Sequence, residues 1–267
     1  MTDIQTQYST GATRQAIEQA LVAAGKDLGH LQPADLALLE DFHTMGRIAT
    51  AQLADLVEIT PDDQVLDAGS GIGGTARYIA ERSRCRVAAV DLTEEYCATA
   101  RWLNQLAGLG DRICVRQADV TDLPFEDATF TLMFSQHVQM NVADKALLYA
   151  EAHRVLARGG KLAVWDIVAA QDGEPDFPVP WADRPEYSHL TTSDRLRTAI
   201  ATSGFEIEQW NDLTGQAASM MQTLLTLPPS PIGLQAFVPY FESKAKNLTA
   251  ALADGRLRAI QGLARAI

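Results

Sequence analysis

Two hydrophobic periods alternate along the middle of the chain. Short apolar runs of strand length occupy residues 63–69, 86–92, 112–119, 129–136, 161–169 and 205–213. Between them, apolar positions recur at the spacing of one helix face in residues 74–83, 93–108, 143–156 and 192–204. Strands separated by single helices are joined by right-handed crossovers. The pattern therefore predicts an α/β fold, a doubly wound and mostly parallel sheet with helices on both faces.

The two ends of the chain depart from this alternation. Residues 1–58 are predicted to form a helical N-terminal extension, with one long amphipathic helix over 34–57. The core is expected over 59–211, and it contains a proline-rich, irregular insertion at 171–190. Residues 212–267 are interpreted as a C-terminal helical lid for the substrate, interrupted by prolines. No strand is expected in this last segment.

Composition and charge exclude several classes of partner. The 267 residues carry 34 acidic and 22 basic side chains, a formal net charge of −12, and a field of that sign repels a nucleic-acid backbone. The apolar runs are far shorter than the roughly 18 residues that span a bilayer, and the first residues lack the basic and apolar regions of a secretory leader. The three cysteines lack the spacing of a zinc or redox motif. We therefore expect a cytoplasmic protein that acts on a small molecule, without nucleic acid or membrane, and a homodimer is compatible with this.

The most informative segment is a glycine-rich loop between a predicted strand and a predicted helix. Residues 65–74 read VLDAGSGIGG. Glycines at such a place allow a tight turn and let a cofactor approach the backbone. The spacing of Gly69, Gly71 and Gly74 also matches the dinucleotide-binding fingerprint, so the glycines alone leave the cofactor open. Asp91, at the end of the second strand, can accept hydrogen bonds from the ribose hydroxyls of a dinucleotide or of another nucleoside cofactor.

Three further features distinguish a dinucleotide from a cationic nucleoside cofactor. Asp67 lies two residues before the first glycine, where its carboxylate can face a cationic ammonium but would repel a pyrophosphate. Asp119 ends the third predicted strand, where its carboxylate can accept from an exocyclic adenine amine. The helix-to-strand join at 155–164 reads VLARGGKLAV. With these motifs in this order, the chain resembles the class I S-adenosylmethionine-dependent methyltransferases.

The resemblance implies a Rossmann-like methyltransferase fold, S-adenosylmethionine as cofactor and S-adenosylhomocysteine as product. It implies a cofactor site formed by Asp67, Gly69, Ser70, Gly71, Gly73, Asp91, Leu92, Asp119, Val120 and Ser135. The chain also looks like one small-molecule branch of this family, in residues 41–56, 66–81 and 134–145. That branch includes sarcosine and dimethylglycine N-methyltransferases, together with enzymes acting on natural products and free acids. One departure is the usual antiparallel seventh strand of this fold, for which the C-terminal segment shows no counterpart.

Gln136 and His137 are the candidates for the catalytic role. They follow the fourth predicted strand, and sheets of this kind bind ligands at the carboxyl ends of their strands. A hydroxyl or amine acceptor must lose a proton, for which a histidine is the natural base. A carboxylate acceptor is already ionised, so His137 would then only orient it. The structural alternative for His137 is to cap the helix that follows.

Contacts with the methyl acceptor are assigned to His43, Met140, Trp181 and Met221. An apolar, methionine-containing segment outside the βαβ core suits a partly apolar acceptor, such as a carboxylic or fatty acid or an amine, methylated on O or N. No cluster of His, Asp or Glu has ligand spacing, so no metal is expected. The alternatives are a nicotinamide-dependent oxidoreductase, which has no evident Tyr-x-x-x-Lys pair here, and a cofactor-binding protein without catalysis.

Overall fold

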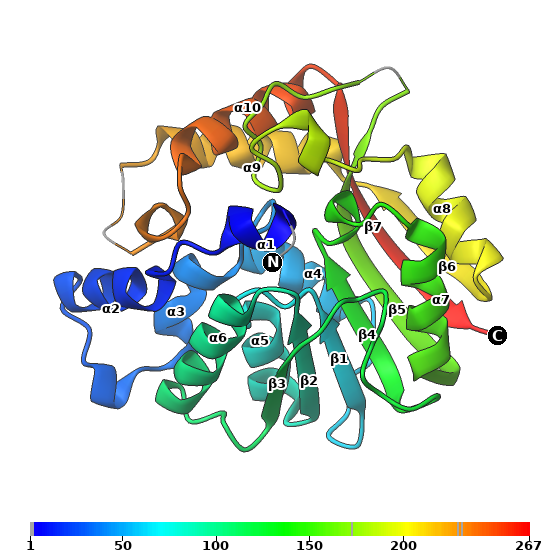
Figure 1. The fold of residues 1–267 in the computed structure, drawn as a ribbon, viewed down its shortest axis with the longest axis horizontal. Helices are drawn as coiled ribbons and strands as arrows, with labels where there is room; N and C mark the ends of the chain where they lie inside the picture. The colour runs from blue at the N-terminus through cyan, green and yellow to red at the C-terminus, as the bar shows by residue number, and fades with distance from the viewer. Residues whose placement is uncertain (1–2, 172, 229, 231) are drawn as a thin grey trace.

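One sheet organises the molecule. The computed structural model describes residues 3–171, 173–228, 230 and 232–267. Within them, the strands are β1 (Gln64–Ala68), β2 (Arg86–Asp91), β3 (Ile113–Gln117), β4 (Phe130–Gln136), β5 (Leu156–Ala169), β6 (Phe205–Asp212) and β7 (Leu257–Ala266). Their order is β3–β2–β1–β4–β5–β7–β6 (Figure 1). Strands β1 to β5 pair in parallel, whereas β7 runs antiparallel to β5 and β6. The predicted doubly wound, mostly parallel sheet is confirmed.

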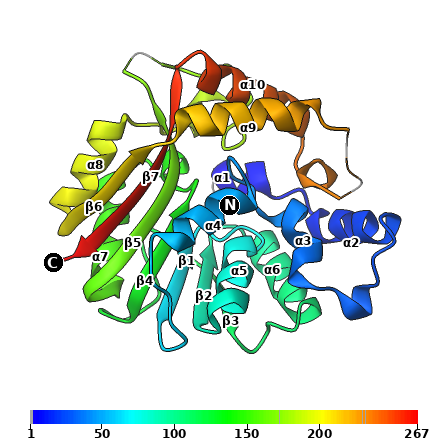
Figure 2. The same cartoon turned by 180° about the vertical axis from the view of Figure 1, so that it is seen from behind.

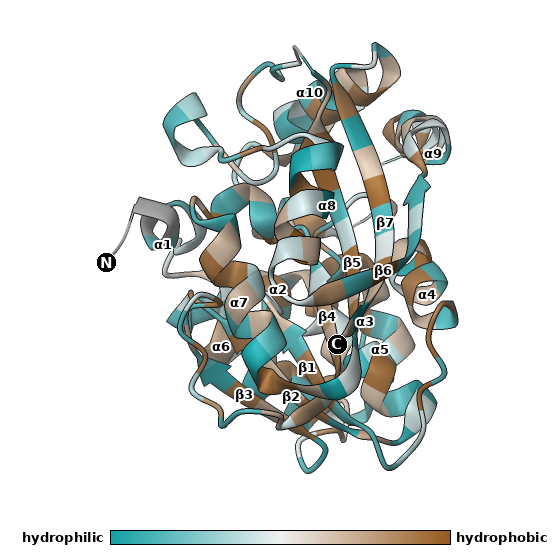
Figure 3. Ribbon diagram, turned by 90° about the vertical axis from the view of Figure 1, so that its right-hand side faces the viewer, coloured by the Kyte–Doolittle hydropathy of each residue, from teal (hydrophilic) through white to brown (hydrophobic). Residues whose placement is uncertain are grey.

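Helices cover both faces of this sheet (Figures 1 and 2). Along β1, Val65 joins an apolar cluster with α5 (Gly74–Ser83) and α6 (Glu94–Leu106). Leu66 and Ala68 join a cluster with α7 (Lys145–Val155) and α8 (Ser193–Thr202) on the opposite face. Because both faces are covered, parallel strands such as β5 have long apolar stretches (Figure 3). The helices are α1 (Asp3–Tyr8), α2 (Thr13–Ala23), α3 (Pro33–Glu40), α4 (Arg47–Asp55), α5 (Gly74–Ser83), α6 (Glu94–Leu106), α7 (Lys145–Val155), α8 (Ser193–Thr202), α9 (Thr214–Thr226) and α10 (Phe241–Ala253).

The seventh strand shows that the expectation of a wholly helical last segment is wrong. β7 lies between β5 and β6, and it pairs with β5 from Lys161 to Ala169. Alanine, leucine and arginine dominate β7, and these residues favour a helix in isolation. Burial between two neighbouring strands overrides that preference. Gly262 allows the close packing, since a Cβ there would lie 2.6 Å from the ring of Trp210. The chain thus has the antiparallel strand that its sequence did not reveal.

The prediction of one long helix over 34–57 is also wrong. This segment forms two helices, α3 and α4, which are separated by residues 41–46. Gly46 has a left-handed φ of 51°, which a right-handed helix does not admit. The indole Nε1 of Trp165 on β5 donates to the carbonyl oxygen of Thr44 at 3.0 Å. This tertiary contact holds the loop 41–46 at the carboxyl ends of the strands.

A third apolar cluster attaches the N-terminal extension to the core. It joins Ile17 of α2 and Leu36 of α3 to Tyr96 of α6 and to Phe237. Helices α9 and α10 lie across the carboxyl end of the sheet (Figure 2). The segment predicted as a lid, 212–267, therefore supplies these two helices, and its last strand belongs to the sheet.

Candidate functional site

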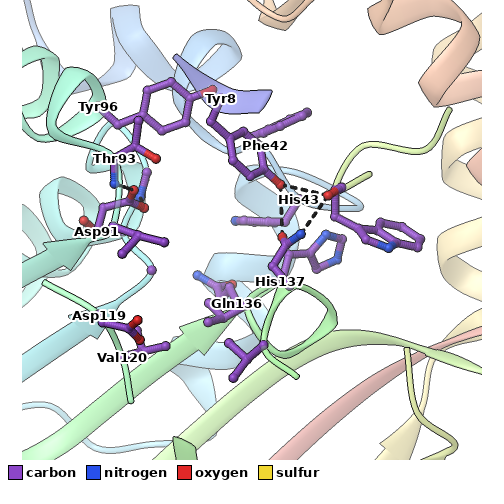
Figure 4. A pocket seen from close by; sticks show the side chains of 18 of the residues that line it. Tyr8, Phe42, His43, Asp91, Thr93, Tyr96, Asp119, Val120, Gln136 and His137 are labelled. Carbon is purple, nitrogen blue, oxygen red and sulfur yellow. Dashed lines mark hydrogen bonds between the residues drawn. The ribbon is translucent and has the colours of Figure 1, made fainter. Parts of the chain in front are cut away.

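A cavity of about 410 Å³ lies at the carboxyl edge of the sheet. The strand order reverses between β1 and β4, so the loops that follow these strands diverge, and doubly wound sheets bind ligands at such a point. The glycine loop after β1, the ends of β2 and β3, the loop after β4, the insertion and α1 all contribute lining residues. Asp91 and Asp119 lie on one side of the cavity and His137 on the other (Figure 4).

Asp91 connects the glycine loop to the start of α6. Its Oδ2 accepts from the backbone N–H of Gly71 at 2.9 Å, and its Oδ1 accepts from the backbone N–H of Thr93 at 2.8 Å. Burial raises the pKa of Asp91, while these two bonds oppose the rise. A carboxylate offers about four lone-pair sites, so both oxygens can still accept from hydroxyl groups of a ligand.

Three buried polar atoms beside the glycine loop have no hydrogen-bond partner among the described residues. They are Oδ2 of Asp67, Oγ of Ser70 and Oε1 of Gln136, and all three residues line the cavity. Gln136 is held by its Nε2, which donates to Oγ1 of Thr75 at 2.6 Å. Burial raises the pKa of Asp67 to about 7, although a hydrogen bond from the backbone N–H of Ala76 opposes this. Leaving a buried acceptor without a donor costs free energy. These three oxygen atoms therefore suit a ligand that brings N–H donors, such as an ammonium.

Asp119 and Val120 form the far end of the cavity. Oδ1 of Asp119 accepts from the backbone N–H and from the hydroxyl of Thr121, at 2.9 and 2.7 Å. This turn fixes the carboxylate just beyond β3, and the largely buried side chain of Val120 lies next to it. A carboxylate beside an apolar surface suits a flat ring that carries an amine.

His43 and His137 lie edge to face, with their ring centroids 5.9 Å apart. His137 has a left-handed φ of 55°, and its backbone N–H donates to the carbonyl oxygen of Trp165 at 2.8 Å. Its Nε2 accepts from the backbone N–H of Thr44 at 3.4 Å, while Nε2 of His43 lies 3.1 Å from Oγ1 of Thr50. Burial lowers the pKa of both histidines, that of His137 well below 6.5. Both rings are therefore uncharged at neutral pH, and strained residues such as His137 cluster at functional sites.

The N-terminal helix α1 contributes Tyr8 to the lining of the cavity, and it lies close to the insertion (Figure 1). The hydroxyl of Tyr8 donates to Oδ1 of Asn141 at 3.0 Å, and Nδ2 of Asn141 donates to the carbonyl oxygen of Trp181 at 2.7 Å. Gln7 extends this link, because its Nε2 donates to the same carbonyl at 2.8 Å and its Oε1 accepts from the N–H of Asp183 at 3.0 Å. Segments distant in the sequence thus form one wall, and Figure 4 shows the bonds among Tyr8, Asn141 and Trp181 as dashed lines.

The structure brings most of the predicted site residues together. The predicted residues that line the cavity are Asp67, Gly69, Ser70, Gly71, Asp91, Leu92, Asp119 and Val120 for the cofactor, Gln136 and His137 for catalysis, and His43 and Trp181 for the acceptor. Four others lie outside the lining. Gly73 precedes α5, Ser135 and Met140 are buried, and Met221 is half-buried on α9.

Several lining residues carried no sequence signal. Tyr8, Phe42, Tyr96 and Phe237 come from four separate segments of the chain, and none was assigned a role from the sequence. Their positions follow from how the extension and the segment before α10 pack on α6. His189 had one usable signal, since it is a histidine near the end of the proline-rich insertion.

Gly69 allows a close approach that a larger residue would prevent. A Cβ at this position would lie 2.4 Å from Cγ2 of Val138, and the φ of Gly69 is 72°. Gly71 is the matched control, because its φ is also positive at 54° but a Cβ there would meet nothing within 4 Å. We expect Gly69→Ala to lower the free energy of unfolding by about 1–2 kcal/mol more than Gly71→Ala. Urea denaturation of both variants measures the difference, and equal losses would show that Val138 simply moves aside.

The described part of the chain has neither a metal-binding cluster nor a membrane-spanning helix. No group of three or more His, Cys, Asp or Glu side chains there is arranged to hold a metal ion. None of its helices is both long and apolar enough to cross a membrane.

Comparison with known proteins identifies the centre of the chain. Residues 66–164 match the family model described as a methyltransferase domain. The chain is 34% identical over 159 residues to a sarcosine/dimethylglycine N-methyltransferase of Halorhodospira halochloris, covering 60% of this chain and 57% of that protein. It is 32% identical over 168 residues to a sterol 24-C-methyltransferase of Eremothecium gossypii, covering 58% of this chain and 43% of that protein. The matches thus span 57% and 43% of these relatives' lengths.

Solved structures agree on the fold. A geranyl diphosphate C-methyltransferase from Streptomyces coelicolor A3(2), in complex with Mg²⁺, geranyl-S-thiolodiphosphate and S-adenosyl-L-homocysteine, matches with a TM-score of 0.73 at 19% identity. The match covers 100% of this chain and 99% of that one. Residues 66–164 thus match a methyltransferase domain, and the whole chain has the Rossmann-like fold of the solved methyltransferase structure.

Proposed function

We propose that this chain transfers a methyl group from S-adenosylmethionine to an O or N atom of a small, partly apolar acceptor. The supporting observation is that one cavity has two unlike parts. We call the part around the glycine loop, Asp91, Asp119 and Gln136 the cofactor half. The acceptor half is the part lined by Phe42, His43, His137, Asn141, Trp181 and His189.

In the cofactor half, each polar group matches one part of S-adenosylmethionine. Asp91 would accept from the ribose hydroxyls, and Asp119 would accept from the adenine amine while Val120 packs on the ring. The unpartnered acceptors of Asp67 and Gln136 would receive the α-ammonium. The bound sulfonium supplies an electrophilic methyl group, with S-adenosylhomocysteine as the product. A nicotinamide cofactor fits less well, because Asp67 would face a pyrophosphate, and the known relatives are methyltransferases.

In the acceptor half, the residues have to hold a nucleophile in line with the methyl group. Methyl transfer requires the attacking atom within about 3–3.5 Å of the carbon and the exclusion of water. The rings of Phe42 and Trp181 exclude water, while His137 and Asn141 offer hydrogen bonds that can orient a polar atom. A sarcosine/dimethylglycine N-methyltransferase and a sterol C-methyltransferase among the relatives have unlike acceptors by name, so the acceptor has to be inferred from this cavity.

Two measurements test the proposal. Calorimetry should detect binding of S-adenosylhomocysteine, and a radiolabelled-methyl assay against pooled acids, amines and phenols should give labelled product. Tight binding of NADH without binding of S-adenosylhomocysteine would point to the oxidoreductase. Binding of S-adenosylhomocysteine without turnover on any pool would favour a cofactor-binding protein without catalysis. A small-molecule acceptor without nucleic acid, a cytoplasmic location, and a homodimer belong to the same proposal.

Asp67 should couple cofactor binding to proton release. In the free protein its pKa is about 7, so about half of the molecules carry the proton at neutral pH. A cationic ammonium beside the carboxylate favours the charged form and lowers this pKa, so binding should expel about half a proton near pH 7 and more near pH 6. Calorimetry of S-adenosylhomocysteine in phosphate and in Tris measures this, because the buffer takes up the released proton and contributes its own heat of protonation.

Asp67→Asn is the matched control for this experiment. It keeps the shape of the side chain but cannot release a proton. The binding enthalpies measured in the two buffers should therefore agree once the heats of dilution are subtracted. Equal heats in the unmutated protein would mean that Asp67 does not face the ammonium.

A further inference from the structure

The acceptor half contains no charged group at neutral pH. Phe42, Asn141 and Trp181 carry no charge. The three histidines, His43, His137 and His189, have pKa values lowered from 6.5, chiefly by burial. An acceptor in this part of the cavity would therefore meet aromatic surface and neutral hydrogen-bonding groups.

The carboxyl groups that line the cavity lie outside the acceptor half, and where they are ionised the charge they bring is negative. Asp67, Asp91 and Asp119 belong to the cofactor half, and Asp144 lines the cavity at the start of α7. S-adenosylmethionine suits this field because its sulfonium and ammonium outweigh its carboxylate. An anionic acceptor would be repelled by it, in a chain whose net charge is already −12.

No lysine or arginine is among the lining residues that the structure describes. The positions left out of the description, 1–2, 172, 229 and 231, are not basic either. Lys145 borders the site, but its Nζ donates to the backbone carbonyls of Gln139, Val142 and His189. Arg47 lies close enough to His43 to lower the pKa of that ring, and its Nε donates to Oδ2 of Asp41 at 2.7 Å.

We propose that the methyl acceptor bears no carboxylate, phosphate or diphosphate and is an uncharged molecule with an apolar body. Burying an anion costs several kcal/mol unless a cation or several donors compensate it, and the acceptor half offers only neutral groups. This inference rests on the proposed methyltransferase function, and it disfavours the carboxylic-acid acceptors that the sequence also allowed.

Two pairs of compounds test whether the site rejects an anion: the first pair is nearly isosteric, and the second differs by a diphosphate group. The protein is first saturated with S-adenosylhomocysteine, and 3-phenylpropanamide and 3-phenylpropanoate are then titrated by calorimetry at neutral pH. Geraniol and geranyl diphosphate, the latter with and without Mg²⁺, form a second pair. We expect the uncharged member of each pair to bind at least about tenfold more tightly, a difference of about 1.4 kcal/mol. Equal or tighter binding of the anion in either pair overturns the inference, and so does the absence of binding by all four compounds.

A charge added to the acceptor half should reverse the preference. His189→Arg places a cation in the wall, and His189→Gln is the matched neutral control. We expect the arginine variant to bind 3-phenylpropanoate about five- to tenfold more tightly than the glutamine variant does, with little change for the amide. Unchanged affinity for the carboxylate would mean that the acceptor does not bind beside His189.

The first step of the titration separates this inference from the proposed function. Failure to bind S-adenosylhomocysteine would remove the proposed function itself. Binding of S-adenosylhomocysteine followed by preference for the anionic probes would leave the methyltransferase function standing and overturn only the inference about the acceptor.

Discussion

Asp91→Ala is expected to raise the dissociation constant of S-adenosylhomocysteine at least about tenfold, and about a hundredfold or more where both ribose bonds are lost. Each hydrogen bond to a carboxylate contributes about 1.5–3 kcal/mol, and about 1.4 kcal/mol corresponds to one factor of ten. The same carboxylate holds the glycine loop through Gly71 and the start of α6 through Thr93. Its loss should therefore also loosen the walls of the cofactor half. Calorimetry gives the dissociation constant.

Two controls separate recognition from general damage. Asp111→Ala removes an exposed carboxylate at the other end of β3 and makes the same change in net charge, so it should leave the affinity unchanged. The thermal midpoint of Asp91→Ala reports whether the domain remains folded. A folded Asp91→Ala protein with unaltered affinity would show that Asp91 does not contact the ribose.

The fold and the cofactor half could be predicted because their signals are local. Asp67, Asp91 and Asp119 each follow from a position at or near the end of a predicted parallel strand. Parallel strands buried on both faces give continuous apolar runs, and glycines mark the turn after β1. A short window of sequence is enough to recognise each of these features.

The seventh strand could not be predicted, because its environment is non-local. Residues such as Ala259, Ala264 and Ala266 favour a helix when considered alone. They are small because β7 runs through the interior between β5 and β6, with Gly262 packed against Trp210. Only the pairing with strands formed about 50–100 residues earlier decides the outcome.

The acceptor half shows the same limit. Tyr8 contributes to it through a bond to Asn141, which lies 133 residues away in the sequence. Phe42 and His43 reach the cavity only because the predicted helix breaks at Gly46 and Trp165 holds the loop through Thr44. No pattern within the N-terminal segment encodes that contact.

His137→Ala is expected to lower kcat/KM by about 10–100-fold, mainly by raising KM. A neutral imidazole has one donor and one acceptor nitrogen. Nε2 accepts from the backbone N–H of Thr44, so the proton lies on Nδ1, and the ring can donate to the acceptor but has no free lone pair for its proton. The proton of a hydroxyl or amine acceptor would then leave to solvent. Losing such a bond and leaving the acceptor unpaired costs about 1–3 kcal/mol. Steady-state kinetics with the acceptor found in the labelled screen separates the two constants.

The pH dependence and a second variant decide between positioning and general-base catalysis by His137. Burial holds its pKa well below 6.5, so the ring stays uncharged above that pH, and the rate should show no inflection from His137 between about pH 6.5 and about pH 8. His137→Asn keeps an N–H donor and tolerates the left-handed φ of 55° better than alanine, so it should recover part of KM. A fall in kcat of about 10²–10⁴ in both variants, together with the loss of an inflection present in the unmutated enzyme, would instead identify His137 as the base. Unchanged constants would leave it a structural residue.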